Sequence, residues 1–109
     1  MKNITITGVR GYIGGQYFNT FIKAQEYDEI YLVLHAHRQD DKNLIKNKHI
    51  HLVYYDGSID SIKNAIINSN VIIHFAALYS TKKDIITYND LIDSNIRLFT
   101  QISTLAEIN

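Results

Sequence analysis

Apolar positions along the chain follow two alternating patterns. Short continuous apolar runs are typical of strands covered on both faces, and apolar residues spaced three or four positions apart are typical of helices with one buried face. The runs predict strands over residues 3–7, 30–34, 50–54 and 71–75. The spaced positions predict helices over residues 12–25 and 89–107, and a third for which Ser58 is the N-cap and which ends near Asn68. The polar stretch over residues 40–48 is expected to form a loop or one weak helical turn.

The alternation of strands and helices predicts an α/β fold with a doubly wound parallel sheet, Rossmann-like in its topology. Right-handed crossovers would place the four strands in the order 3-2-1-4. The chain is expected to form a single domain over residues 1–109. Because only four strands are predicted, the sheet is expected to be truncated, without the second half of a full doubly wound fold.

Each predicted helix has one apolar face that we expect to pack on the sheet. Asn95 is the polar residue on such a face, so its amide must find hydrogen-bond partners. The expected inward residues are Ile13, Tyr17, Phe18, Phe21 and Ile22 in the first helix, Ile59, Ile62, Ile66 and Ile67 in the second, and Leu91, Ile92, Asn95, Leu98, Phe99, Ile102, Leu105 and Ala106 in the last.

The composition indicates a globular soluble protein with one small core, since 46% of the 109 residues are hydrophobic and 20% are charged. Eleven acidic and eleven basic residues give zero net charge, so neither nucleic acid nor an anionic membrane is expected as a partner. Cysteine is absent, which excludes disulfides and zinc–thiolate sites. No apolar run has membrane-spanning length, and strand residues at the very start leave no room for a signal peptide, so a cytoplasmic location is expected.

Three glycines stand between the first predicted strand and the first predicted helix, in the spacing G-x-x-G-x-x-G. Gly8 would let the chain leave the strand in a tight turn, Gly11 would leave room for a pyrophosphate, and Gly14 would let the helix pack closely on the strand. The free N–H groups and the positive dipole end at a helix start attract an anion. These features predict a dinucleotide-binding loop, and the alternative is a glycine-rich turn without a ligand.

The segment Thr7-Gly8-Val9-Arg10-Gly11-Tyr12-Ile13-Gly14 resembles the glycine fingerprint of the short-chain dehydrogenase/reductase superfamily, and most of all that of its extended branch. That branch contains the NAD(P)-dependent epimerases, dehydratases and reductases of sugar nucleotides. The resemblance extends over essentially the whole chain. It implies the N-terminal, cofactor-binding portion of such an enzyme, with Tyr12 and Ile13 in the cofactor loop.

The end of the second predicted strand is where this fold meets the adenine ribose. An acid there binds the 2′-hydroxyl of NAD, whereas an arginine accommodates the 2′-phosphate of NADP. No acid follows the strand before Asp40, and Arg38 is well placed for the phosphate. Arg10, inside the glycine loop, could face a phosphate as well. NADP is therefore the preferred cofactor and NAD the second choice, and the alternative is that both arginines are solvated surface residues.

Further cofactor contacts are implied by the resemblance. It implies that Asp56 hydrogen-bonds the adenine amino group, and a turn or helix-capping role is open beside it. It also implies that Ala76, Ala77 and Leu78, after the fourth strand, let the backbone lie against the cofactor. Asn95 resembles a family residue that helps fix the sheet and a proton-relay water, and the open alternative is a hydrogen bond to the helix backbone.

No catalytic residue is assigned in this chain. In the family a catalytic tyrosine and lysine, four residues apart, follow the fifth strand. The match here, Tyr79 with Lys83, lies directly after the fourth predicted strand, and we interpret it as chance.

The histidines are interpreted as structural. His74 is expected to be a packed strand residue rather than a catalytic one. No metal site is expected from the two His-x-His pairs, because neither has an identifiable third ligand. These pairs are His35 with His37 and His49 with His51.

The motifs together predict the NAD(P)-binding portion of a sugar-nucleotide epimerase, dehydratase or reductase, with no turnover alone. A nucleotide-sugar substrate is expected only in a longer chain. One alternative is a non-catalytic NADP-binding regulatory module. The other is a self-associating remnant, because the fourth strand would leave an open apolar sheet edge that invites a homo-oligomer.

Overall fold

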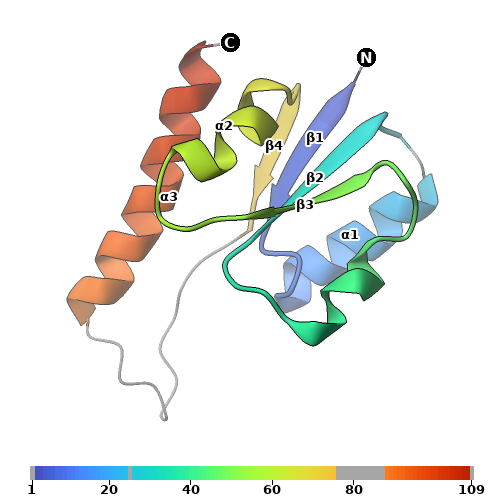
Figure 1. Ribbon diagram of the computed structural model, residues 1–109, viewed down its shortest axis with the longest axis horizontal. Helices are drawn as coiled ribbons and strands as arrows, with labels where there is room; N and C mark the ends of the chain where they lie inside the picture. Colours follow the sequence, from blue (N-terminus) through green and yellow to red (C-terminus); the bar gives the residue numbers. More distant parts are fainter. Residues whose placement is uncertain (1, 25, 76–87, 109) are drawn as a thin grey trace.

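The computed structural model describes residues 2–24, 26–75 and 88–108, and of these the side chains outside residues 22–24, 88–95 and 108. Strands and helices alternate along the chain (Figure 1). The elements are the strands β1 (Asn3–Thr7), β2 (Glu29–Leu34), β3 (Ile50–Tyr54) and β4 (Val71–His74), the helices α1 (Tyr12–Ala24), α2 (Asp60–Ile67) and α3 (Tyr88–Ile108), and the 3₁₀ helix η1 (Gln39–Leu44).

The described strands form one parallel sheet in the order β3-β2-β1-β4 (Figure 1). The predicted order 3-2-1-4 and the Rossmann-like topology are confirmed. In this sheet β1 is central, and its residue Ile4 lies opposite Ile30 of β2 and Val71 of β4. Because the strands are parallel, their carboxyl ends meet at one edge, where the connections after β1, β2 and β3 come together.

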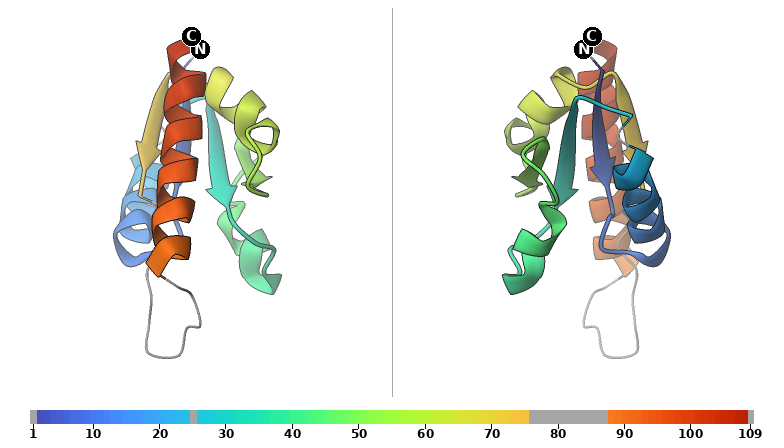
Figure 2. Two further views of the ribbon diagram at one scale, coloured as in Figure 1. Left: turned by 90° about the vertical axis from the view of Figure 1, so that its left-hand side faces the viewer. Right: turned by 90° about the vertical axis from the view of Figure 1, so that its right-hand side faces the viewer.

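The helices cover the two faces of the sheet as separate layers. Helix α1 lies on one face and α2 on the opposite one, together with α3 (Figures 1 and 2). Phe18 of α1 packs in a cluster with Ile6 of β1, whereas Ile62 of α2 and Leu98 of α3 pack in a second cluster with Val33 of β2. Each fully buried aliphatic or aromatic side chain stabilises the fold by about 1.5–3 kcal/mol. The sheet is therefore held rigid between two apolar layers.

The predicted inward faces are largely confirmed. Ile22, Leu91, Ile92 and Asn95 have side chains outside the described residues. Tyr17, Ile59 and Ile67 are half-buried. The buried members are Phe18, Phe21, Ile62, Ile66, Leu98, Ile102 and Leu105.

Three residues predicted to face inward are exposed instead. Ile13, in the first turn of α1, is 69% exposed, and the adjacent Gly14 takes the buried position. Phe99 is 58% exposed, and Ala106 is exposed as well. Each of these two directly follows a fully inward leucine, and successive helix residues are about 100° apart around the axis. The buried stripe of α3 is therefore narrower than predicted.

The element boundaries differ from the prediction by one or two residues. Strand β4 ends at His74, one residue early, and η1 forms in the segment expected to be a loop or weak turn. Helix α2 begins at Asp60, two residues after Ser58. The Ser58 hydroxyl nevertheless accepts a hydrogen bond from the Ser61 amide at 3.3 Å, which is the contact expected of a capping residue.

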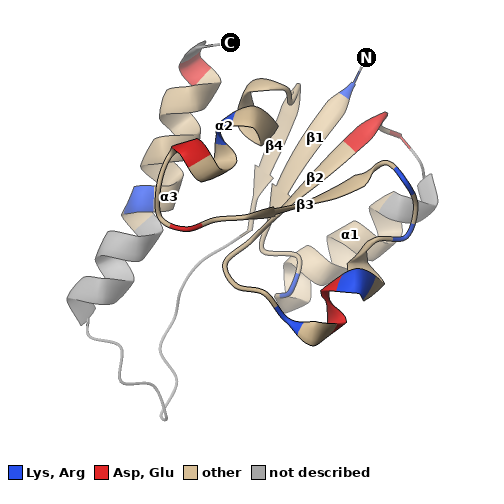
Figure 3. Ribbon diagram, in the orientation of Figure 1, with Lys and Arg blue, Asp and Glu red and all other residues tan. Residues whose placement is uncertain are grey.

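Acidic and basic side chains are intermixed over the described part of the chain, and both signs occur along and beside η1 (Figure 3). Among the described helices, none combines the length and the apolarity that crossing a membrane requires.

Candidate functional site

The glycine loop has the backbone geometry that its motif predicts. Gly8 has a φ angle of 80°, a left-handed backbone conformation that residues with a Cβ rarely adopt. A Cβ on Gly14 would lie 2.0 Å from the carbonyl oxygen of Gly8, so only glycine allows α1 to start this close to the loop. At Gly11 a Cβ would be 3.4 Å from the same oxygen, an ordinary contact. The fold therefore requires glycine at Gly8 and Gly14, whereas the described residues leave room for a Cβ at Gly11.

The first turn of α1 lies at the carboxyl edge of the sheet. Tyr12 is 84% exposed and Ile13 69% exposed, directly after the loop. The first N–H groups of a helix lack partners within it and carry a partial positive charge. The loop thus offers backbone donors and open space at the place where parallel α/β folds bind ligands.

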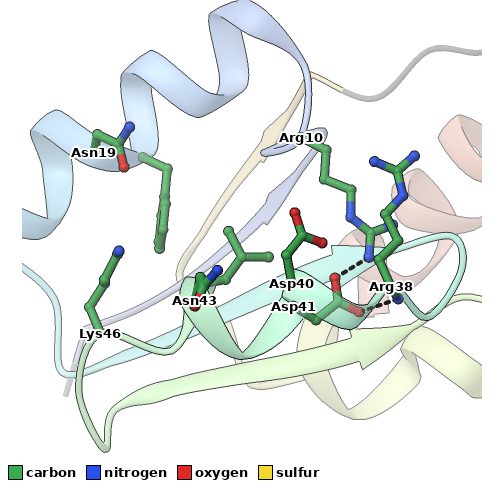
Figure 4. A pocket seen from close by; sticks show the side chains of 9 residues that line it. Arg10, Asn19, Arg38, Asp40, Asp41, Asn43 and Lys46 are labelled. Carbon is green, nitrogen blue, oxygen red and sulfur yellow. Dashed lines mark hydrogen bonds and ion pairs between the residues drawn. The ribbon is translucent and has the colours of Figure 1, made fainter.

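Arg10, also in the loop, is held by two partners on the segment after β2. Its Nη2 donates a hydrogen bond to the carbonyl oxygen of Ala36 at 2.7 Å and forms an ion pair with Oδ1 of Asp41 (Figure 4). The side chains of Arg10 and Asp41 are 19% and 7% exposed. The glycine loop and the β2–η1 segment are therefore tied together by a largely buried charge pair.

Asp41 is the centre of this network. Its Oδ2 accepts hydrogen bonds from the Arg38 amide at 2.8 Å and from the Tyr54 hydroxyl at 2.7 Å. Burial acts to raise the pKa of Asp41, but the hydrogen bonds from Arg38, Arg10 and Tyr54 outweigh it and lower this pKa to about 2. The same contact with Asp41 raises the pKa of Tyr54. The carboxylate is thus ionised at neutral pH, and it joins the loop, η1 and β3.

A cavity of ≈ 300 Å³ lies between α1 and η1 (Figure 4). Arg38 reaches it with an exposed side chain, and no hydrogen bond or ion pair holds its guanidinium among the described residues. The cavity is therefore polar, and three of its lining residues are cations. Arg10 is paired with Asp41, Arg38 is unpaired among the described residues, and Lys46 lies on the side of Asn19, away from Arg38 (Figure 4). Its lining residues are Arg10, Phe18, Asn19, Arg38, Asp40, Asp41, Asn43, Leu44 and Lys46.

Asp41 is not distinguished from its neighbour Asp40 by the sequence. Asp40 is the first acid after the second predicted strand, and both acids stand in a polar stretch without apolar periodicity. Only the 3₁₀ turn of η1 makes Asp41 buried and leaves Asp40 exposed. A usable signal existed in the arginine of the glycine loop, because a cation in a buried position needs an acid close by.

Asp56 follows β3 at the same edge of the sheet. Its Oδ1 accepts hydrogen bonds from the Ser58 amide at 2.8 Å and from the Ser58 hydroxyl at 2.6 Å. These contacts lower the pKa of Asp56. The turn role is therefore present in the structure. The adenine contact stays a prediction, and Asp56 is exposed at the edge where it would be made.

The remaining expected contacts follow β4. Ala76, Ala77 and Leu78 lie outside the described residues, as do Tyr79 and Lys83 of the chance match. Asn95 lies in α3, with its side chain outside the described part.

The histidines divide into two groups. His74 Nδ1 lies 2.7 Å from the Thr7 hydroxyl oxygen, and burial, with a smaller effect of His35, lowers the pKa of this strand histidine. His35 and His37 pack edge-on and stacked against two different tyrosines, so they do not share a site. Among the described residues, no group of three or more His, Asp or Glu side chains could hold a metal ion.

The chain resembles known proteins in sequence profile and in fold. The family model described as "NAD dependent epimerase/dehydratase family" matches residues 4–109. No curated protein sequence matches the chain.

Three solved structures with a similar fold are 14–17% identical in sequence to the chain. A mutant of uronate dehydrogenase from Agrobacterium tumefaciens, complexed with NAD, has a TM-score of 0.72 and 14% identity, over 100% of this chain and 37% of that one. UDP-N-acetylglucosamine 4-epimerase from Bacillus cereus has a TM-score of 0.62 and 17% identity, over 96% and 31%. A wide-type short-chain dehydrogenase/reductase from Veillonella parvula, in complex with NADP, has a TM-score of 0.60 and 17% identity, over 95% and 43%. The chain therefore spans less than half the length of each of these proteins.

Proposed function

Because this chain belongs to the NAD-dependent epimerase/dehydratase family, we propose that it is the cofactor-binding portion of an NAD(P)-dependent epimerase, dehydratase or reductase of a sugar nucleotide. The glycine loop carries this proposal. Gly8 and Gly14 are required by the fold itself, whereas Gly11 has room for a side chain that the sequence does not use. A ligand that lies against the backbone at Gly11 accounts for that unused space.

The proposed site runs along the carboxyl edge of the sheet. The pyrophosphate would lie at Gly11 and the start of α1, beside the exposed Tyr12 and Ile13. The adenine would lie between the ends of β2 and β3, where Asp56 is exposed. The contacts of Ala76, Ala77, Leu78 and Asn95 stay predictions, because these residues or their side chains lie outside the described part of the chain.

NADP is the proposed cofactor in preference to NAD. The observation that favours it is the unpaired guanidinium of Arg38, which lines a cavity at the end of β2. A guanidinium binds phosphate through paired N–H groups. The similar folds include one protein in complex with NAD and another in complex with NADP, so both cofactors occur on this scaffold.

Catalysis is proposed to need more chain than these 109 residues. The chain spans 31–43% of the three solved proteins, and a nucleotide-sugar substrate would meet it only within a longer protein. We therefore expect no oxidation of sugar nucleotides by the purified chain, measured by nicotinamide absorbance. Measurable turnover would contradict this expectation. Cofactor binding without turnover would agree with it, and a non-catalytic regulatory module would give the same result.

The binding site is tested most sharply by Gly11→Ala. The added Cβ makes only an ordinary contact with Gly8, so the protein is expected to keep its melting temperature, but the methyl group fills the space proposed for the pyrophosphate. Fluorescence titration should show NADPH binding weakened by about tenfold or more.

The matched control for this test is Thr20→Ala, at an exposed position of α1, which should leave both NADPH affinity and melting temperature unchanged. Equal NADPH affinity of Gly11→Ala and the unsubstituted chain would overturn the proposed site. Tighter binding of NADH than of NADPH by the unsubstituted chain would overturn the NADP preference alone.

Self-association is a separate expectation. Strand β4 is an edge of the described sheet, and Phe99 beside it, with its ring centroid 6.2 Å from that of His74, is 58% exposed. Size-exclusion chromatography with light scattering would measure it, and a clean monomer would contradict it.

A further inference from the structure

Two arginines reach the same cavity in very different states. Arg10 donates to Ala36 and is paired with Asp41, whereas the guanidinium of Arg38 is exposed and has no partner among the described residues (Figure 4). From the sequence, both were expected to be able to face a phosphate. The difference arises from the buried carboxylate of Asp41.

Asp41 holds Arg10 firmly. The carboxylate is 7% exposed in its side chain and accepts hydrogen bonds from Arg10, the Arg38 amide and the Tyr54 hydroxyl. Withdrawing Arg10 would leave a buried negative charge without its counter-charge, which is strongly unfavourable. The lowered pKa of Asp41, about 2, is a second sign that the ionised carboxylate is well stabilised. Arg10 is therefore expected to stay on Asp41 when a ligand arrives.

A paired guanidinium offers little to a phosphate. Arg10 keeps further N–H groups, but the Arg10–Asp41 pair has no net charge, and a phosphate beside it would also meet the carboxylate of Asp41. Arg38 has no such neighbour in contact with its guanidinium. The attraction for a second phosphate on the ribose thus falls to Arg38.

We propose that Asp41 is a specificity-determining residue of the cofactor site: by pairing with Arg10 it limits the preference for a 2′-phosphate and leaves Arg38 as the cation that recognises it. This inference rests on the proposed function, because it concerns the ribose end of the same dinucleotide. Asp41 acts through Arg10, so it is a positioning residue rather than one that touches the cofactor.

The decisive measurement compares 2′,5′-ADP with 5′-AMP, which differ only by the 2′-phosphate. Isothermal titration calorimetry gives the ratio of their dissociation constants in each variant. In Asp41→Asn the freed Arg10 should increase the preference for 2′,5′-ADP by about tenfold, and the affinity for 5′-AMP should stay within about twofold. A merely structural role of Asp41 would weaken both ligands equally.

Two further variants separate charge from position. Asp40→Asn removes the same charge from the neighbouring, exposed acid of the same cavity, and it should change the preference by less than about twofold. The double variant Asp41→Asn/Arg10→Gln should lose the gain of Asp41→Asn, because that gain requires Arg10. A gain that persists in the double variant, or one equalled by Asp40→Asn, would overturn the proposal.

Arg38→Gln keeps the test valid if Asp41→Asn does not fold. The exposed guanidinium of Arg38 has no partner among the described residues, so its removal should leave the melting temperature unchanged. The preference for 2′,5′-ADP over 5′-AMP should then disappear. A preference that survives would mean that Arg10 recognises the phosphate, and the inference would be wrong. If the unsubstituted chain binds neither nucleotide, the proposed function itself fails, which is a distinct outcome.

Discussion

Two acid-centred clusters lie at opposite ends of β2 and β3. At the amino ends, Glu29 Oε2 lies 2.6 Å from Nε2 of His51, and Oε1 lies 3.5 Å from Nδ1 of His49. The side chains of these three residues are between 31% and 48% exposed. The His51 contact is the largest influence on the pKa of Glu29 and lowers it.

The cluster at the carboxyl ends has the same plan but another environment. Asp41 is 7% exposed in its side chain, and its cationic partner is the guanidinium of Arg10, which is 19% exposed. An exposed ion pair is screened by water and salt and contributes little, whereas a buried and fully hydrogen-bonded one can fix the position of the segments that it joins. We infer that the carboxyl-end cluster positions the glycine loop and that the amino-end cluster has no comparable role.

Asp41→Ala should have the largest effect on this comparison. The substitution leaves the guanidinium of Arg10, the hydroxyl of Tyr54 and the amide of Arg38 without their acceptor. The melting temperature measured by circular dichroism at neutral pH should fall by roughly 5–10 °C. The exposed neighbour Asp40→Ala serves as the control and should change it by no more than about 2 °C. Equal losses in the two variants would show that Asp41 does not organise this edge.

The sequence was informative where a residue's role depends on near neighbours. The predicted bounds of β1 and β3 agree with the structure residue for residue. The required glycines, Gly8 and Gly14, follow from the spacing of one motif. The family resemblance is confirmed over residues 4–109.

Residues whose role depends on distant parts of the chain were harder to predict. Asp41 meets Arg10 and Tyr54, which are 31 and 13 positions away, and its burial depends on a short 3₁₀ turn. Phe99 is apolar, yet it stays 58% exposed beside His74 of β4. Contacts between residues so far apart in the chain are set by the tertiary fold, so local sequence patterns did not reveal them.

The histidines at the carboxyl ends should make stability depend on pH. Burial, with a smaller effect of Arg10, lowers the pKa of His35, and burial lowers that of His74 as well. In the unfolded chain these two histidines bind protons near pH 6.5, whereas in the folded chain they bind them only at lower pH. Stability should therefore fall as the pH falls through that value, giving a melting temperature a few degrees lower at about pH 5.5 than at about pH 7.5.

The double variant His35→Gln/His74→Asn should flatten this pH dependence. A matched pair of substitutions at the amino ends, His49→Gln/His51→Gln, should leave it in place, because those side chains lie at the opposite ends of the strands and contact Glu29 instead. Flattening by the second pair instead of the first would reverse the assignment of the two clusters.

Glu29→Gln should have the smallest effect. Glu29 lies at the amino ends of the strands, away from the loops of the proposed cofactor site, and its contacts with the two histidines are partly open to water. At neutral pH the melting temperature should change by less than about 2 °C. Added salt should shift it by no more than it shifts the melting temperature of the unsubstituted chain. The lowered pKa of Glu29 means that its stabilising contribution is present above the ordinary carboxyl range and is lost only as the pH falls below it. NADPH affinity should be unchanged, since neither end of the dinucleotide would reach these strand ends. Glu29→Gln could instead lose as much NADPH binding as Gly11→Ala. The amino ends of the strands would then shape the site as strongly as the glycine loop, and the contrast between the two clusters would have to be abandoned.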